Sequence, residues 1–155
     1  MTSEPELRKI RIALPEDSWQ GVEAEWAWGE RTGDDIYALR NTPFYAKGLS
    51  HDDQVKVNDE NGTLKLLGVV SRGGHSTYRI FVKQGQDDPR VQALLKTLTE
   101  LHCGIEGATD RLIAIDVLPD ADIYEVYRVL ENAYTSGLID FEEGHCGHPL
   151  SSRPQ

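Results

Sequence analysis

The hydrophobic pattern of this chain changes near residue 72, and that change limits the folds available to it. Before this point, apolar residues alternate with polar ones at the two-residue period of β-strands. After it, strand-like runs are separated by two segments with the spacing of amphipathic helices. The sequence therefore predicts an α+β protein with a β-rich subdomain (8–72), an α+β subdomain (73–146) and a disordered tail (147–155).

The first half holds five short strand-like runs separated by turn residues. The run 9–14 alternates and stops at Pro15, and the run 22–28 places tryptophans on one face and glutamates on the other. Asn61-Gly62 lies between two further runs and is a strong hairpin signal. Five short strands of this kind predict a small β-barrel-like structure or a curled antiparallel sheet.

The second half alternates strands with helices. Asp88 and Pro89 have the residue types of a helix N-cap and first turn, and Gly104 is expected to end that helix. Asp122 is expected to start the second helix and Gly137 to end it. Strand-like runs precede, separate and follow these helices. The order β-α-β-β-α-β predicts a ferredoxin-like unit.

Length and composition indicate a globular protein. The 155 residues include 39% hydrophobic and 27% charged residues, a balance typical of folded soluble chains. The sequence has no apolar run of the roughly 18 residues that a membrane helix needs, and its acidic start differs from a secretory signal. We therefore expect a cytoplasmic protein with its two cysteines reduced.

The net charge restricts the kinds of partner. It is −10, from 26 acidic and 16 basic residues, and both halves are acidic. Nucleic acids and anionic membranes bind basic surfaces, so we expect neither as a partner. An acidic protein attracts basic partners, and we expect a basic protein, possibly a toxin. The alternative is that the charge serves only solubility.

Glycines and polar residues stand together at the start of the apolar strand 80–82, in the run 71–79. Along a strand, His75 and Thr77 share one face and Ser76 lies on the other, so a His75–Ser76 catalytic pair is disfavoured. If the protein is an enzyme, His75 and Thr77 are the candidate catalytic residues. Binding, with Arg79 included, and a structural role at the strand end are the alternatives.

The segment 41–50 contains a second group of candidate binding residues. Phe44, Tyr45 and Lys47 lie between a proline and a glycine, in a loop that either plugs the barrel or offers a binding surface. Asp52 and Asp53 follow directly and add acidic groups to that surface.

The tripeptide His-Cys-Gly occurs twice, and the predicted topology brings both copies to one edge of the sheet. His102, Cys103, His145 and Cys146 would then form a tetrahedral zinc site. The spacing matches no standard zinc module, and cysteines that are simply buried are the alternative. We expect no metal and no cofactor.

Several segments resemble one protein family. They are GVEAEWA (21–27), NTPFYAKG (41–48), GHST (74–77), RLIAIDV (111–117) and FEEG (141–144). On these segments the chain resembles the bacterial DUF4265 family, a domain of unknown function, over roughly residues 8 to 144. The resemblance implies the extent of the fold and carries no assigned activity, cofactor or catalytic residue.

Two functions fit these observations. The first is a non-catalytic, acidic protein-binding module, most simply an immunity-type inhibitor that covers the active site of a bacterial toxin. Asp52 and Asp53 would contribute to its binding surface. The second is a small enzyme or a small-molecule-sensing domain. Its site would lie around His75 at the seam, which is the place where the two halves join, at residues 71–79.

Overall fold

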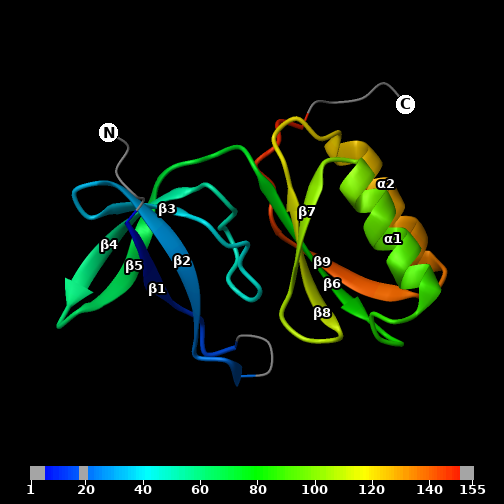
Figure 1. Cartoon of the computed structure of the whole chain (residues 1–155), viewed down its shortest axis with the longest axis horizontal. Helices are drawn as coiled ribbons and strands as arrows, with labels where there is room; N and C mark the ends of the chain where they lie inside the picture. Colours follow the sequence, from blue (N-terminus) through cyan, green and yellow to red (C-terminus); the bar gives the residue numbers. More distant parts are fainter. Residues whose placement is uncertain (1–5, 18–20, 151–155) are drawn as a thin grey trace.

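The computed structural model describes residues 6–17 and 21–150. These residues form a closed five-stranded barrel followed by a four-stranded sheet with two helices (Figure 1). The protein is therefore a mixed α+β protein, and its N-terminal half is the curled antiparallel structure that the strand pattern predicts.

The barrel is a meander in which each strand pairs with the next. Its strands are β1 (Leu7–Ala13), β2 (Ala24–Gly33), β3 (Ile36–Leu39), β4 (Gln54–Glu60) and β5 (Thr63–Ser71). Successive strands are antiparallel, and a short parallel pairing of Ile10 with Leu64 closes the barrel between β1 and β5. The predicted hairpin is present between β4 and β5, where Asn61 and Gly62 both have positive φ.

Alternation along β2 decides which side chains enter the barrel. Glu25 and Ala27 are buried, whereas Trp26 and Trp28 on the opposite face are 52% and 44% exposed. The barrel interior is instead filled by aliphatic side chains such as Ile10. The tryptophan face of β2 is therefore an outer surface of the protein.

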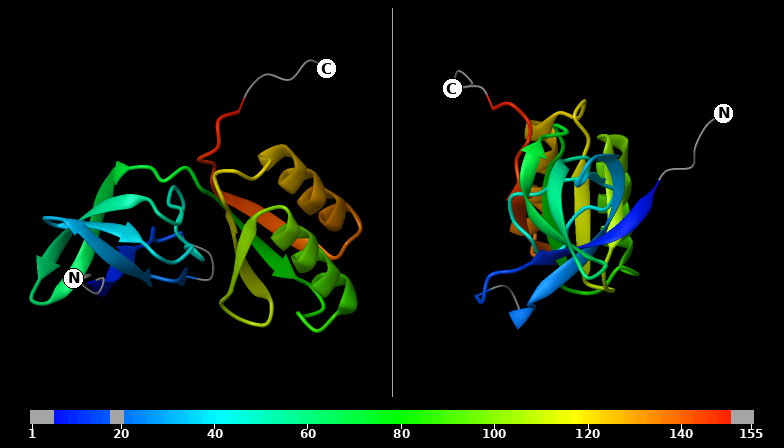
Figure 2. Two further views of the ribbon diagram at one scale, coloured as in Figure 1. Left: turned by 45° about the horizontal axis from the view of Figure 1, so that its top comes forward. Right: turned by 90° about the vertical axis from the view of Figure 1, so that its left-hand side faces the viewer.

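The second half contains the elements β6 (Ser76–Val82), α1 (Pro89–Glu100), β7 (Cys103–Gly107), β8 (Leu112–Val117), α2 (Ile123–Thr135) and β9 (Ile139–His145). The strand order across the sheet is β7-β8-β6-β9, and all neighbouring strands are antiparallel. Both helices cover the face of the sheet that is turned away from the barrel (Figure 2). The other face of the sheet is thus turned toward the barrel.

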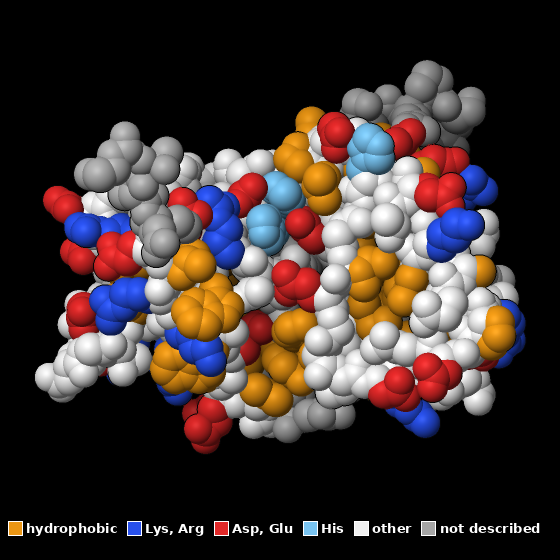
Figure 3. Space-filling model, viewed as in Figure 1, with side chains coloured by type: hydrophobic (Ala, Val, Ile, Leu, Met, Phe, Trp, Pro, Cys, Tyr) orange, Lys and Arg blue, Asp and Glu red, His pale blue; other side chains and the backbone are white. Residues whose placement is uncertain are grey.

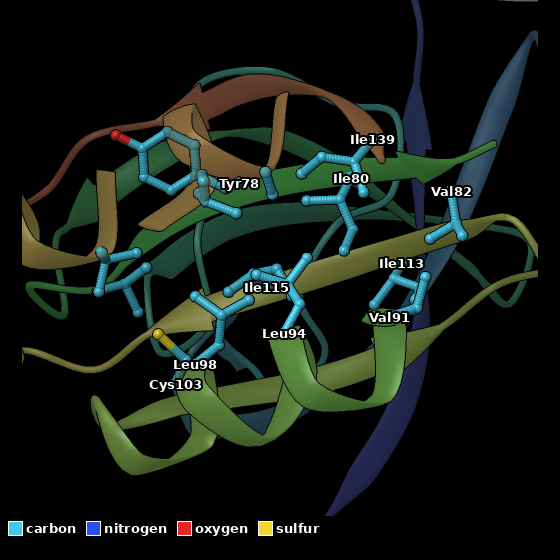
Figure 4. Close-up of a cluster of buried hydrophobic side chains, with 14 of the residues drawn as sticks. Tyr78, Ile80, Val82, Val91, Leu94, Leu98, Cys103, Ile113, Ile115 and Ile139 are labelled. Carbon is cyan, nitrogen blue, oxygen red and sulfur yellow. The ribbon is translucent and has the colours of Figure 1, made fainter. Parts of the chain in front are cut away.

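The core of the second half lies between the helices and the sheet. Val91, Leu94 and Leu98 of α1 point at Ile80 and Ile115 of the central strands (Figure 4). All five side chains are buried. The apolar residues spaced along one face of the helix therefore pack against the apolar residues that alternate along the strands.

The helix starts agree with their capping signals, and one predicted helix end is wrong. The Asp88 side chain accepts a hydrogen bond from the Arg90 N–H, and Asp122 caps α2 in the same way. Gly104 does not end α1. The helix ends at Glu100, His102 adopts a positive φ of 67°, and Gly104 lies inside β7. The His102 carbonyl accepts a hydrogen bond from Leu118 N–H, which holds this turn.

The long connection 40–53 between β3 and β4 extends from the barrel to the sheet (Figure 1). The seam is the region where this connection contacts the strands of the sheet, for example through the Gly48 N–H, which donates to Gly144 O at 2.8 Å. Within the described residues, neither helix is long and apolar enough to cross a membrane.

Candidate functional site

Strand β6 presents different side chains to its two sides. Thr77 pairs with Asp116 of β8, and both residues face the barrel. His75 directly precedes β6 and lies on this side as well, because its ring contacts the barrel residue Asp52. Ser76 points the other way, toward His148. The structure thus brings His75 and Thr77 to the seam and separates Ser76 from them.

His75 lies between two carboxylates. Its Nδ1 is 2.7 Å from Asp116 Oδ1, and its Nε2 is 3.2 Å from Asp52 Oδ2. The ring is almost completely buried. The two carboxylates come from opposite sides of the seam, so His75 connects the barrel to the sheet.

His51 completes a cluster with these residues. Its ring centroid is 5.2 Å from that of His75, and its Nδ1 is 3.5 Å from Asp52 Oδ1 and 3.8 Å from Asp116 Oδ2. This Nδ1 is buried and has no hydrogen-bond partner. Figure 3 shows histidine side chains beside acidic ones over the seam. We call His51, Asp52, His75 and Asp116 the histidine–aspartate cluster.

Asp52 is held in place by its backbone and its side chain. Its N–H donates to Leu39 O at 2.8 Å, its φ is +68°, and its carboxylate forms an ion pair with Arg40. Arg40 in turn contacts Glu30 of β2 at 3.1 Å. The Asp52 carboxylate is therefore directed at His75 by groups that belong to the barrel.

Asp53 and Thr77, both predicted as binding residues, have structural roles. The buried Asp53 carboxylate accepts hydrogen bonds from the N–H groups of Ser50 and Gly73 and from the Arg72 guanidinium, at 2.9 to 3.1 Å. Thr77 Oγ1 lies 2.7 Å from Ser50 Oγ. Both side chains are thus used within the chain, to fix the connection 40–53.

Two charged side chains hold the segment 43–46 by its backbone. The Glu25 carboxylate accepts the N–H groups of Phe44, Tyr45 and Ala46 at 2.6 to 3.0 Å. Arg79 is only 2% exposed and donates from the sheet to the carbonyls of residues 43, 45 and 46 at 2.7 to 3.4 Å. Arg79 Nε also donates to Glu142 at 2.9 Å. Four of the five guanidinium N–H groups are therefore used within the chain.

Ser76 and His148 attach the C-terminal segment to β6. The His148 Nε2 lies 2.8 Å from Leu118 O, so this nitrogen carries the proton and Nδ1 accepts from the Ser76 hydroxyl at 2.6 Å. The Gly147 N–H donates to Ser76 Oγ at 2.9 Å. Gly147 and His148 lie in the stretch expected to be a tail, yet they are held against the sheet; residues 151–155 lie outside the described residues.

A large cleft opens along the seam. Its volume is about 1080 Å³, and Phe44, Tyr45 and Lys47 of the connection line one side of it. The far side is formed by the barrel-facing side of β6 and β9, including Phe81 and Glu142. The three loop residues predicted to form a binding surface are thus part of one concave surface.

The predicted zinc ligands do not assemble in the described part of the chain. His102 contacts Asp120 on the surface at 3.0 Å, and the Cys146 thiol lies 3.6 Å from His148 O. Cys103 is buried in the core, and burial, assisted by the charge of Asp116, raises the pKa of its thiol to about 12. The group with metal-ligand spacing is instead His51, His75 and Asp116.

Sequence reasoning missed four residues that shape this region. Glu25 and Asp116 look like the polar positions of ordinary strands, and His148 lies in a stretch rich in turn residues. The only local indication for His51 was its position next to Asp52 in the sequence. Its proximity to His75 depends on the closing of the barrel against the sheet, which no local pattern encodes.

Comparison with known families gives a clear assignment. The profile described as "Domain of unknown function (DUF4265)" matches residues 25–141, which is most of the chain. The chain belongs to the DUF4265 family. The region matched to DUF4265 contains the histidine–aspartate cluster, Glu25 and Arg79. The family resemblance seen in the sequence is confirmed.

One solved structure is similar over nearly the whole molecule. It is a hypothetical protein from Neisseria gonorrhoeae, with a TM-score of 0.78 and 17% sequence identity, and the match covers 91% of this chain and 96% of that chain. At this identity the similarity shows the fold alone. No curated protein matches the chain.

Proposed function

We propose that this DUF4265 protein is a small-molecule-binding domain whose ligand occupies the cleft at the seam. The cleft itself carries the proposal. Its volume of about 1080 Å³ is close to the upper end of the range of ligand pockets, roughly 300 to 1,000 Å³. It lies where two structural units meet, which is a common place for such pockets.

The lining indicates the chemistry of the ligand. The floor is apolar, and it includes Ile12, Leu14, Leu49, Leu66 and Phe81. Asp17, Asp140 and Glu142 line the cleft with Lys47 and Arg79, and because Arg79 forms an ion pair with Glu142, one negative charge is in excess. A net acidic lining over an apolar floor favours a ligand with an apolar body and a positively charged group such as an amine.

The cleft is fixed before a ligand arrives. Glu25 and Arg79 hold the backbone of 43–46 from both sides, and the Gly48 N–H donates to Gly144 O. A ligand therefore meets Phe44 and Tyr45 on a segment that is already ordered. Binding then costs less conformational entropy, which supports measurable affinity for a small molecule.

The second half supports a sensing role only by analogy. We interpret it as a ferredoxin-like unit, because its order is β-α-β-β-α-β and the strand following α2 lies at the edge beside β6. Such units often host small-molecule regulation, but a fold does not fix a function. The proposal therefore depends on the cleft.

The test measures binding of charged and neutral probes. The melting temperature is recorded with a series of arylalkylamines and with the neutral alcohols of the same shape. We expect amines to raise the Tm by about 2 °C or more at saturation and the alcohols to do so less. Equal shifts for both series, or no shift for any amine, contradict the proposal.

A blocking variant locates the binding. Ala13 is exposed and lines the cleft, so Ala13→Trp fills the cleft without changing the core. Ala93→Trp is the matched control, because Ala93 is exposed on α1 on the other side of the sheet. We expect the amine-induced shift to disappear in Ala13→Trp and to persist in Ala93→Trp.

A protein-binding role of the immunity type is the second candidate, and the exposed tryptophans favour it. Trp26 and Trp28 lie side by side on the outer face of β2, and aromatic residues are enriched at interface centres. The net charge of −10 favours a basic partner such as a toxin. Asp53 cannot contribute to this surface, because it is fully buried.

Affinity capture tests this second candidate. The wild-type chain and the double variant Trp26→Ala/Trp28→Ala are used as baits in the same host extract. The proposal expects one stoichiometric basic protein that the double variant loses and whose association rate falls steeply with ionic strength. Capture of the same protein by both baits excludes the tryptophan face as the interface.

A further inference from the structure

We propose that His51, His75 and Asp116 of the histidine–aspartate cluster bind a divalent transition-metal ion. One ligand atom from each of these residues lies within 4.8 Å of the others. In a tetrahedral site with ligand bonds of about 2.1 Å, ligand atoms are about 3.4 Å apart. Small side-chain rotations therefore bring the three groups to one ion. This site is independent of the proposed ligand in the cleft.

The free nitrogen of His51 is the observation that points to a ligand. His51 Nδ1 is buried, has no hydrogen-bond partner and faces the carboxylates of Asp52 and Asp116 at 3.5 and 3.8 Å. A buried polar atom without a partner is costly in a folded protein. A metal ion between His51 and the carboxylates would satisfy this nitrogen.

The surroundings of the cluster resemble the outer shell of metal sites. Histidine ligands usually donate their second ring N–H to a carboxylate, which fixes the ring. His75 already contacts carboxylates through both nitrogens, Asp116 at 2.7 Å and Asp52 at 3.2 Å. Asp52 is positioned by Arg40 and supplies a further carboxylate beside the ion.

The donor set indicates the class of metal. Two imidazoles and a carboxylate suit first-row transition metals such as Zn²⁺, Co²⁺ or Fe²⁺, whereas Mg²⁺ and Ca²⁺ prefer oxygen ligands alone. The side chains of His51 and Asp52 are 25% and 38% exposed, so an ion can enter from solvent. The same opening leaves coordination positions for water or for a bound molecule.

The experiment titrates the chelator-treated full-length protein with Zn²⁺ by calorimetry and with Co²⁺ by visible absorption. We expect one Zn²⁺ per chain with micromolar or tighter affinity, and Co²⁺ bands typical of nitrogen and oxygen ligands. Mg²⁺ and Ca²⁺ should bind at least tenfold more weakly. Absence of stoichiometric Zn²⁺ binding overturns the proposal.

Variants locate the site. His51→Ala removes the unpartnered nitrogen and should weaken Zn²⁺ binding at least tenfold, as should His75→Ala. His51→Ala keeps the test valid if His75→Ala fails to fold, because His51 Nδ1 contributes no hydrogen bond. His102→Ala is the matched control, since His102 also lies beside an aspartate but on the exposed surface. Unchanged binding in His51→Ala, or loss in His102→Ala, contradicts the assignment.

Discussion

Glu25 is an example of how much one buried side chain can determine. It lies on β2 with the carboxylate directed at three consecutive backbone N–H groups of the segment 43–46. It is 8% exposed, so water does not readily replace it. The conformation of this lining segment therefore depends on a residue that belongs to the neighbouring strand.

We predict that Glu25→Ala lowers the free energy of unfolding by about 3 kcal/mol or more, because it leaves several poorly solvated N–H groups without an acceptor. Urea denaturation of the purified protein measures this loss. Glu23→Ala is the control, since Glu23 lies on the same stretch and is exposed. A difference from the control of less than about 0.5 kcal/mol would show that water takes over the acceptor role.

His145 provides a prediction of pH dependence. Burial, followed by the positive charge of Arg72, lowers the pKa of His145 below its usual value of 6.5. The unfolded chain therefore binds a proton more readily than the folded one, and stability falls as the pH drops from 6.5 through the folded pKa. We expect His145→Gln to reduce this loss, as measured by urea denaturation between pH 5 and 7.5. Parallel curves for the two proteins would refute the assignment.

At the scale of elements, the C-terminal segment is attached to β6 by a close backbone approach. A Cβ at position 147 would collide with the backbone carbonyl oxygen of His75. Gly147 also donates its N–H to Ser76. The chain therefore needs a glycine at position 147, where it leaves β9 and crosses the start of β6.

We predict that Gly147→Ala displaces this segment, because the atom it meets belongs to the backbone and cannot rotate away. The expected results are a loss of about 1 to 3 kcal/mol in stability and faster hydrogen exchange around Ser76. Gly68→Ala is the control, since a Cβ at Gly68 meets nothing within 4 Å. If both variants behave alike, the close approach at Gly147 is not needed for the fold.

Sequence reasoning predicted correctly those elements that are determined by residues close together in the sequence. Asp88 and Asp122 cap their helices through contacts within three residues, and the hairpin turn uses the positive φ of Asn61 and Gly62. The predicted end of α1 at Gly104 was wrong because His102 takes the left-handed conformation that glycine usually supplies. A local rule cannot anticipate a non-glycine residue in that role.

At the scale of the whole molecule, polar contacts join the barrel to the sheet. Arg79 and Thr77 of the sheet contact the connection 40–53, and His75 contacts Asp52. All three tryptophans of the chain lie before residue 29, whereas both helices lie in the second half. Trp26 and Trp28 lie on β2, so their fluorescence reports on the barrel, whereas far-UV circular dichroism reports on the helices.

We predict that the two signals change at the same urea concentration in the wild-type protein, because the seam couples the halves. Arg79→Ala removes the donors that hold residues 43, 45 and 46, and it should separate the two transitions. Arg128→Ala is the control, because Arg128 forms an ion pair with Glu125 on the exposed surface of α2. Separate transitions in the wild type would show that the halves fold independently.

The candidate site was less predictable than the elements. The sequence pointed to His75, Asp52 and the loop 41–50, and these residues do lie at the seam. It did not pair His75 with His51 and Asp116, because these positions are 24 and 41 residues away and meet only when β8 and the barrel are in place. It also treated Arg79 as a binding residue, although most donors of its buried guanidinium are used within the chain.

Because the segment 43–46 is held by its backbone, its side chains are open to change during evolution. Glu25 and Arg79 bond to its backbone atoms, and those bonds do not depend on which side chains the segment carries. Phe44 and Tyr45 can therefore be exchanged for other residues while the segment keeps its position. Substitution at these two positions would therefore change the lining of the cleft, where we propose that a ligand binds, without rebuilding the scaffold.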